Sequence, residues 1–261
     1  MSVGVEVHGH VGLVEMRRPP HNFLSPSLVE AVADALEGFD RDLNVRCAVL
    51  AAEGRSFCAG ADFGSGGGGE GEDGGRGPVG ASTTERLYAV AARLCGLDIP
   101  FVAAVHGPAI GGGLGLAMTA NLRVTCPEAR FSANFAKLGI HQGFGLSVTL
   151  PEQIGPSRAA LVLLGGARYK GEEAVELGMA DRCVPTDQVR EAAMALAGEI
   201  AENAPLAVRA INRTLRRGLA DRVREATRHE AAEQLRLSAS ADAAEGVRAV
   251  SERRPGDYVG R

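Results

Sequence analysis

The chain has 261 residues, 45% of them hydrophobic, and a formal net charge of −4. This length suits one α/β domain with a modest extension. The absence of any run of about 18 apolar residues argues against a membrane span. The acidic balance and an aromatic content of 4% argue against nucleic-acid binding. The N-terminus lacks signal-peptide features, and the five cysteines are scattered without a CxxC pair, so we expect a cytoplasmic protein with reduced thiols and no metal.

The first two thirds of the chain alternate between strand and helix patterns. Ser25-Pro26-Ser27 is typical of a helix start, with a capping serine followed by proline in the first turn. Alternation of this kind predicts parallel strands in an α/β core. The predicted strands are 3–7, 11–16, 47–52, 101–105, 122–126 and 129–133, and the predicted helices are 26–39, 84–97, 147–154, 156–164, 171–177 and 187–203.

After Ala204-Pro205 the pattern is almost entirely helical to about residue 254. We therefore divide the chain into a core, 1–204, and a C-terminal helical region, 205–261. An apolar stripe in this region predicts core packing or a subunit contact rather than a ligand site. Its members are Leu206, Ile211, Leu215, Leu219, Val223 and Leu235.

Residues 64–77 contain nine glycines in fourteen positions. This composition is typical of a surface loop. A lid over a site is the alternative, because the loop directly follows the SFCAGADF segment.

The stretch IGGGLGLAM, residues 110–118, follows a predicted strand and opens a helix. It lacks the lysine of a phosphate-binding Walker loop. It also lacks the third glycine and the later acid of a dinucleotide site. Unblocked backbone N–H groups at such a turn can donate to a developing oxyanion, and SFCAGAD, residues 56–62, is the expected source of a second donor.

Four segments together resemble the crotonase superfamily, the enoyl-CoA hydratase/isomerase family. They are FCAGADF (57–63), HGPAIGGGLGLAM (106–118), EARFSANFAKLGI (128–140) and SADAAEGVRAVSERRP (240–255), and the resemblance runs from residue 17 to residue 255 in the right order. It implies an α/β spiral core of ββα repeats with a C-terminal helical trimerisation region. It also implies a homotrimer or a dimer of trimers that takes a coenzyme A thioester as substrate and holds no permanent cofactor.

By motif position, the resemblance makes Ala61 and Gly112 the backbone donors of an oxyanion hole for the thioester carbonyl. Two such donors would stabilise the enolate that forms when charge moves onto that oxygen, and one is typically worth about 3 kcal/mol. The resemblance places Ala59, Asp62 and Phe63 at the substrate, with Asp62 mainly structural. It offers Arg17, Arg18 and Arg253 as cations for the phosphates of coenzyme A, with Arg253 reaching in from a neighbouring subunit.

The chain departs from the family pattern at the two catalytic glutamates. Their positions are occupied by Gly115 and Phe135. Glycine and phenylalanine cannot carry protons, and the loss of one positioned acid or base costs about 10²–10⁴ in rate. Ordinary hydration is therefore not expected.

A replacement base is sought in the loop 141–147. His141 is the candidate base, since histidine is the side chain that most often serves this role, and an ordinary loop histidine is the alternative. Gln142 is a candidate for orienting water or a carbonyl group. Phe63, Phe135 and Phe144 are expected to line the acyl pocket. The predicted function is an acyl-CoA enzyme of the hydratase/isomerase type, and the alternative is a catalytically silent acyl-CoA-binding protein of the same fold.

Overall fold

A computed structural model describes residues 2–62 and 81–261. For residues 81 and 82 it describes the backbone alone. Its larger sheet has the strand order β1-β2-β3-β4-β6-β9, and β5-β7-β8 form a second sheet. The first two strands pair antiparallel, while the other neighbours in the larger sheet pair in parallel. The strands are β1 Val3–His8, β2 Val11–Met16, β3 Cys47–Ala52, β4 Phe101–Val105, β5 Ala109–Ile110, β6 Leu122–Thr125, β7 Arg130–Ser132, β8 Tyr169–Lys170 and β9 Arg182–Cys183.

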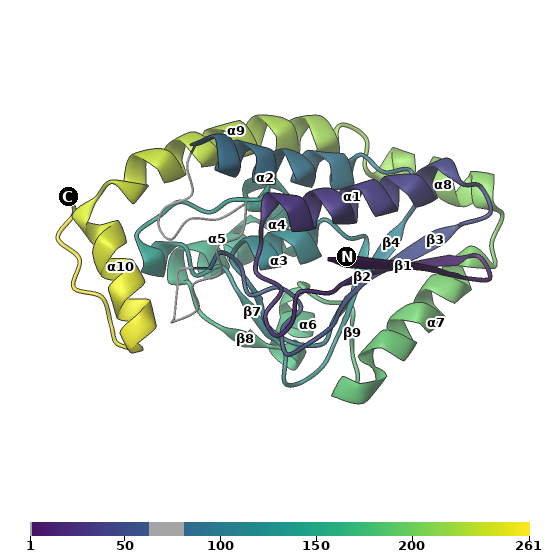
Figure 1. The fold of residues 1–261 in the computed structure, drawn as a ribbon, viewed down its shortest axis with the longest axis horizontal. Coiled ribbons are helices and arrows are strands. Elements are labelled where there is room, and N and C mark those ends of the chain that lie inside the picture. Colours follow the sequence, from purple (N-terminus) through teal and green to yellow (C-terminus); the bar gives the residue numbers. More distant parts are fainter. Residues whose placement is uncertain (1, 63–80) are drawn as a thin grey trace.

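Helices cover the sheets and extend beyond them (Figure 1). The α-helices are α1 Pro26–Arg41, α2 Ala81–Cys95, α3 Gly112–Met118, α4 Leu146–Ile154, α5 Pro156–Gly165, α6 Gly171–Leu177, α7 Val189–Ala201, α8 Pro205–Leu215, α9 Leu219–Ser238 and α10 Ala241–Glu252. Two 3-10 turns, η1 Ala136–Leu138 and η2 Thr186–Gln188, complete the described elements. The mixed α/β class predicted from the sequence is confirmed.

The predicted start of the first helix is confirmed in detail. The Ser25 hydroxyl accepts a hydrogen bond from the Leu28 N–H, and Pro26 opens the first turn of α1. The helix then buries an apolar face that includes Val32 and Leu36 against the sheet. This face belongs to one hydrophobic core that also contains β3 and β4.

The strands that sequence analysis missed are β5, β8 and β9, which have two residues each. Elements this short carry no readable periodicity. In the tail, the continuous helical pattern is divided into three helices. Gly218, with φ of 73°, precedes α9, and Ser240 caps α10.

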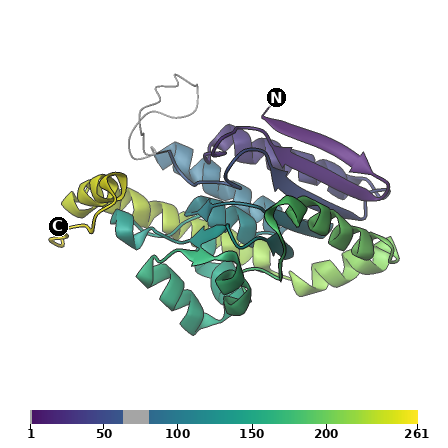
Figure 2. The same ribbon diagram turned by 90° about the horizontal axis from the view of Figure 1, so that it is seen from below.

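The C-terminal helices reach across the molecule. Figure 1 shows α9 running along α2, and Figure 2 places α10 at the end of the molecule away from the N-terminal hairpin. Buried polar contacts tie α8 to the preceding part of the chain, since Arg209 donates to the carboxylate of Asp40 at 2.9 Å. Asn212 donates to the carbonyls of Leu97 and Asp98. The boundary at residue 204 therefore separates regions that pack tightly together.

All five cysteines are free, and four of them are buried. Burial raises the pKa of the Cys58 thiol to about 12, so this side chain behaves as a small apolar group at neutral pH. In the described part of the chain, no helix combines the length and the apolar character needed to cross a bilayer.

Candidate functional site

Two segments that are distant in the sequence lie side by side next to the second sheet. The Cys58 N–H donates to the carbonyl of Pro108 at 3.0 Å, and the Ile110 N–H donates to the carbonyl of Cys58 at 3.0 Å. Cys58 and Ala109 form a parallel bridge between the same segments. The CAGAD turn and the glycine cluster are thus joined by backbone hydrogen bonds, as the oxyanion-hole hypothesis requires.

Two glycines make this close approach possible. Gly60 has φ of 80°, and a Cβ atom there would lie 2.6 Å from the carbonyl oxygen of Ile110. A Cβ atom on Gly113 would lie 2.1 Å from the carbonyl oxygen of Cys58. Because both obstacles are backbone atoms, a larger residue at either position would push the segments apart.

The N–H groups of Ala61 and Gly112 lie at this junction. Gly112 is the first residue of α3, where backbone N–H groups have no acceptor within the helix. Within residues 2–62 and 81–261, neither N–H is paired with a backbone acceptor. Both residues line a cavity.

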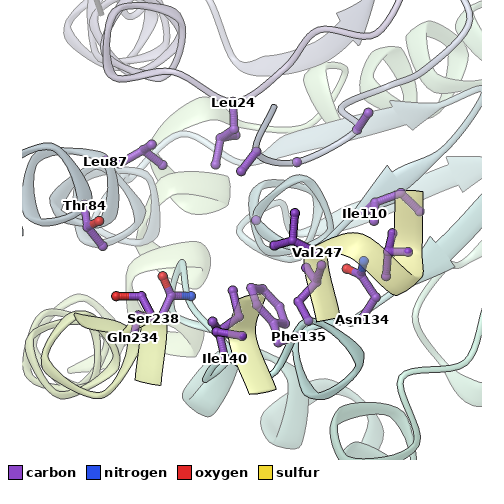
Figure 3. A pocket seen from close by; sticks show the side chains of 18 of the residues that line it. Leu24, Thr84, Leu87, Ile110, Asn134, Phe135, Ile140, Gln234, Ser238 and Val247 are labelled. Atoms are coloured by element: carbon purple, nitrogen blue, oxygen red, sulfur yellow. The ribbon is translucent and has the colours of Figure 1, made fainter. Parts of the chain in front are cut away.

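The cavity has a volume of about 600 Å³ and lies between the joined segments and the C-terminal helices. Figure 3 shows Leu24 and Leu87 on one side, with Phe135, Ile140 and Val247 across from them. The described lining residues are Leu24, Ala59, Gly60, Ala61, Thr84, Leu87, Tyr88, Ile110, Gly111, Gly112, Asn134, Phe135, Leu138, Ile140, Arg168, Gln234, Leu235, Ser238, Ala243, Ala244, Val247 and Val250. This volume and the mostly apolar lining are typical of a small-molecule site.

None of these described lining residues is an aspartate, a glutamate, a histidine or a cysteine. The charged side chain among them is Arg168, and the other polar side chains are amides and hydroxyls. Among the described residues, no three histidine, cysteine or acidic side chains come together as a metal would require.

Gly115 and Phe135, the positions where the resemblance expects acids, differ in their surroundings. Phe135 lines the cavity. Gly115 is buried behind it, and a Cβ atom there would lie 2.7 Å from the Cβ of Phe144 and 3.1 Å from its carbonyl oxygen. A carboxylate at residue 115 would need Phe144 to move.

The expectation that Phe144 lines the acyl pocket is wrong. Its ring is fully buried and meets the ring of Tyr88 edge to face, with centroids 6.3 Å apart. Phe144 has φ of 59°, and this backbone conformation directs the residue against Gly115 instead of into the cavity.

His141 and Gln142 do not reach the cavity wall. The ring of His141 lies against that of His229, with centroids 5.6 Å apart, and its Nδ1 lies 2.8 Å from the carbonyl oxygen of Gln142. The side chain of Gln142 donates to the hydroxyl of Ser147 at 3.1 Å. The roles of His141 as a base and Gln142 as an orienting group therefore lack geometric support.

The predicted cations have different partners. Arg17 forms ion pairs with Glu6, Glu15 and Glu53, so its charge is already matched by carboxylates. Arg18 donates to the hydroxyls of two serines, Ser25 at 2.8 Å and Ser27 at 3.0 Å. These neutral partners leave its charge available to an anion.

Arg253 is exposed and directly follows α10, whose Val247 and Val250 line the cavity of the same chain. Its contact with a neighbouring subunit stays a prediction. Asp62 is exposed and lies next to Ala61, outside the described cavity lining. Phe63 and the glycine-rich segment 64–77 lie outside the described residues.

Sequence analysis missed several polar lining residues. Tyr88 on α2 and Gln234 and Ser238 on α9 face the cavity, as do Asn134 and Arg168 from the second sheet and its connections. Leu235, assigned to an apolar packing stripe, also lines the cavity. The sequence signal for them is the spacing of polar residues four apart, Thr84 with Tyr88 and Gln234 with Ser238. This spacing indicates a shared site only once the two helices are known to be neighbours.

Comparison with known proteins identifies the family of the chain. The family model for enoyl-CoA hydratase/isomerase matches residues 6–261. The enoyl-CoA hydratase EchA19 of Mycobacterium tuberculosis is 34% identical over 263 residues, covering 98% of this chain and 96% of that protein. A carnitinyl-CoA dehydratase of Proteus mirabilis is 30% identical over 265 residues, covering 100% and 99%.

A solved structure shows the same fold. The crystal structure of an enoyl-CoA hydratase/isomerase from Pseudoalteromonas atlantica has a TM-score of 0.84 and 26% sequence identity, and the match covers 99% of this chain and 100% of that one. The chain belongs to the enoyl-CoA hydratase/isomerase family and has the crotonase fold.

Proposed function

We propose that this protein binds an acyl-CoA thioester and polarises its carbonyl group through the N–H groups of Ala61 and Gly112. The observation that carries the proposal is the junction of the two segments at the cavity, where both donors lack a described backbone acceptor. The acyl group would occupy the apolar cavity.

Polarisation moves charge from the α-carbon onto the carbonyl oxygen, as in a thioester enolate. Two fixed donors in a pocket with little water stabilise that charge without reorganising. Removal of one donor of this kind typically costs about 10²–10³ in rate. This chemistry fits an enzyme of the hydratase/isomerase type.

The phosphates of coenzyme A need nearby cations. Because the chain has a net charge of −4, these must be particular basic side chains at the site. Of the predicted arginines, Arg18 fits this role better than Arg17, because its described partners are neutral hydroxyls. Arg253 remains part of the proposal as a contribution from a neighbouring subunit.

A catalytically silent acyl-CoA-binding protein is the second candidate. It is favoured by the lack of aspartate, glutamate and histidine among the described lining residues, with Gly115 and Phe135 in place of the usual acids. Without a positioned acid and base, water cannot be deprotonated and a proton cannot be delivered efficiently to the α-carbon. Both candidates share thioester binding and differ in turnover.

Binding through the carbonyl can be tested without changing the protein. Isothermal titration should show that hexanoyl-CoA binds about 10-fold more tightly than hexyl-CoA, a thioether that lacks the carbonyl oxygen. Equal affinities would contradict the proposed oxyanion hole. The failure of both compounds to bind would contradict both candidate functions.

Hydrogen exchange at the α-carbon distinguishes an active enzyme from a silent binding protein. Incubation of the complex with hexanoyl-CoA in D₂O reports enolate formation as deuterium at the α-carbon, measured by mass spectrometry. Exchange above the uncatalysed rate supports an enzyme of the isomerase type, whereas binding without exchange supports the silent protein.

The oligomer and location are part of the same proposal. Leu206, Ile211 and Leu215 on α8 are exposed, at 70%, 60% and 79% respectively, which supports a subunit contact in a homotrimer or dimer of trimers. Light scattering would test this by giving the mass in solution. The cytoplasmic location predicted from the cysteine pattern belongs to this proposal too.

A further inference from the structure

Four uncharged polar side chains from two neighbouring helices line one side of the cavity, apart from Asn134 and Arg168, which come from the second sheet and its connections. Thr84 and Tyr88 lie four residues apart on α2, and Gln234 and Ser238 lie four residues apart on α9. Residues at this spacing share one face of a helix. We call these four residues the polar face.

The two helices run antiparallel, so the four side chains meet in pairs. The side chains of Tyr88 and Gln234 interact, while Gly96, just beyond the end of α2, lies next to Ala220 at the start of α9. With this direction, Thr84 on α2 and Ser238 on α9 both lie one helical turn from the Tyr88–Gln234 contact, on the same side of it. Figure 3 shows Thr84, Gln234 and Ser238 on one side of the pocket and Ile110, Phe135 and Asn134 on the other.

The polar face is held in place by contacts of its own. The side-chain amide of Gln234 donates to the carbonyl of His141 at 2.7 Å. Tyr88 is 7% exposed, and burial beside Glu230 raises the pKa of its phenol, which therefore keeps its proton at neutral pH. Thr84 is 8% exposed. These side chains are fixed groups within the wall of the cavity.

Ser238 offers an acceptor to a ligand. Its hydroxyl donates to the carbonyl of Leu235 at 2.9 Å, which uses the one hydrogen it has. The lone pairs of the oxygen remain acceptors, so a group that donates a hydrogen bond suits this position. No arginine or lysine belongs to the polar face, and the Glu230 carboxylate lies behind Tyr88, so an anionic group is disfavoured there.

We infer that the polar face binds a hydroxyl group carried by the distal part of the acyl chain, so that this protein selects hydroxylated acyl-CoAs over plain ones. This inference rests on the proposed function. This hydroxyl differs from the one that hydration would place on the β-carbon of the thioester. The polar face lies on α2 and α9, whereas the proposed donors for the thioester carbonyl lie on the joined segments around Ala61 and Gly112.

The test compares octanoyl-CoA with a series of derivatives, each carrying one hydroxyl group at a different carbon of the distal half. Isothermal titration should show one isomer binding about 10-fold more tightly than octanoyl-CoA, the size of a well-formed hydrogen bond. The corresponding keto derivative should gain less, because it cannot donate to Ser238.

Two conservative variants assign the preference to the polar face. Ser238→Ala and Thr84→Val each remove one hydroxyl group. Each should bring the ratio of the affinities for the hydroxylated isomer and for octanoyl-CoA close to 1, while the affinity for octanoyl-CoA itself changes less than 2-fold. Ser251→Ala, an exposed serine near the end of α10, is the matched control and should leave the preference intact. Thermal melting of each variant checks that it is folded.

The hydroxyl and amide groups of the pantetheine arm are the competing source of the same chemistry. If Ser238→Ala weakened octanoyl-CoA and its hydroxylated derivative equally, the polar face would contact that arm, and the inference would be overturned. Binding of octanoyl-CoA with no preference for any isomer would overturn the inference and leave the proposed function standing. Failure of every thioester to bind would overturn both.

Discussion

The proposed thioester site and the positions where the resemblance expects acids are built in different ways. Backbone groups supply the donors at Ala61 and Gly112, and the hydrogen bonds between Cys58, Pro108 and Ile110 hold their segments together. The acid positions depend on side chains, and those at 115 and 135 carry none that can transfer a proton. A site made of backbone persists through many side-chain substitutions, whereas proton transfer is lost with one or two.

This difference makes carbonyl polarisation separable from hydration within one fold. The space next to Gly115 is filled by the buried side chain of Phe144, so this region is part of the hydrophobic core. The predictions below disturb each of the two regions in turn, beginning with the largest expected effect.

Gly113→Ala should weaken hexanoyl-CoA binding by more than about 10-fold, because it disturbs the donors for the carbonyl group, which account for about 10-fold, and also the cavity wall at Ala61 and Gly112. The added methyl group would lie 2.1 Å from the carbonyl oxygen of Cys58 and force the two segments apart. Isothermal titration measures the effect. Gly38→Ala on α1 is the control, since a Cβ atom there meets nothing within 4 Å, and it should leave binding unchanged. An unaltered affinity for Gly113→Ala would contradict the role given to the joined segments.

Phe135→Glu and Gly115→Glu should differ in their effect on hydration. Phe135 lines the cavity, so a glutamate there can face the ligand, and we expect the hydration rate of trans-2-hexenoyl-CoA to rise about 10²-fold. Gly115→Glu should give no increase and should destabilise the fold by about 1–3 kcal/mol, because its side chain meets Phe144. Loss of the enoyl absorbance measures the rate and urea unfolding measures the stability. Hydration restored by Gly115→Glu alone would show that Phe144 does not block that position.

Glu230→Gln should lower the free energy of unfolding by about 1–3 kcal/mol. The buried carboxylate of Glu230 accepts from the N–H groups of Gly145 at 2.8 Å and Ser147 at 3.0 Å, and so anchors the loop that carries Phe144. Urea unfolding measures the loss. Glu233→Gln on the same helix, half-buried and paired with the exposed Arg236, should change stability much less, because such surface ion pairs contribute little. Equal effects of the two variants would show that the Phe144 loop does not depend on Glu230.

The smallest expected effect concerns the C-terminal wall of the cavity. Hydrogen bonds from Arg254 and from the Asp257 N–H lower the pKa of Glu245 on α10 to about 2. Its ordinary value is 4.5, so its contribution to stability is present above about pH 4.5 and disappears as the pH falls toward 2. Glu245→Gln should therefore lower Tm at pH 6, and the difference from the original protein should shrink as the pH approaches 2. A Tm difference that stays constant across this range would contradict the assignment.

Local sequence patterns predicted much of the fold. Ser25 and Pro26 marked the start of α1, and the runs 47–52 and 101–105 marked buried strands. The segments that meet at Ala61 and Gly112 were also identified from their small residues and their family resemblance. These features depend on neighbouring residues, and so a sequence records them directly.

The parts that could not be predicted depend on contacts between distant segments. Phe144 was expected in the cavity, and its burial against Gly115 follows from a positive φ angle that the sequence did not reveal. The polar face joins Tyr88 to Gln234, which are far apart in the chain. His141 was placed at the site by the family resemblance of its loop and by its chemistry, and the packing of its ring against His229 could not be foreseen.

The ultraviolet spectrum of trans-2-hexenoyl-CoA mixed with a molar excess of the protein tests the central claim most directly. Donors on the carbonyl oxygen shift the absorption band of a conjugated thioester to longer wavelength, and hydration removes the band. We predict a shifted band that persists, because in the proposed function the N–H groups of Ala61 and Gly112 polarise the carbonyl, and no described lining residue is an acid or histidine that could hydrate the double bond. A band that stays at its original wavelength, or one that disappears rapidly, would contradict this account.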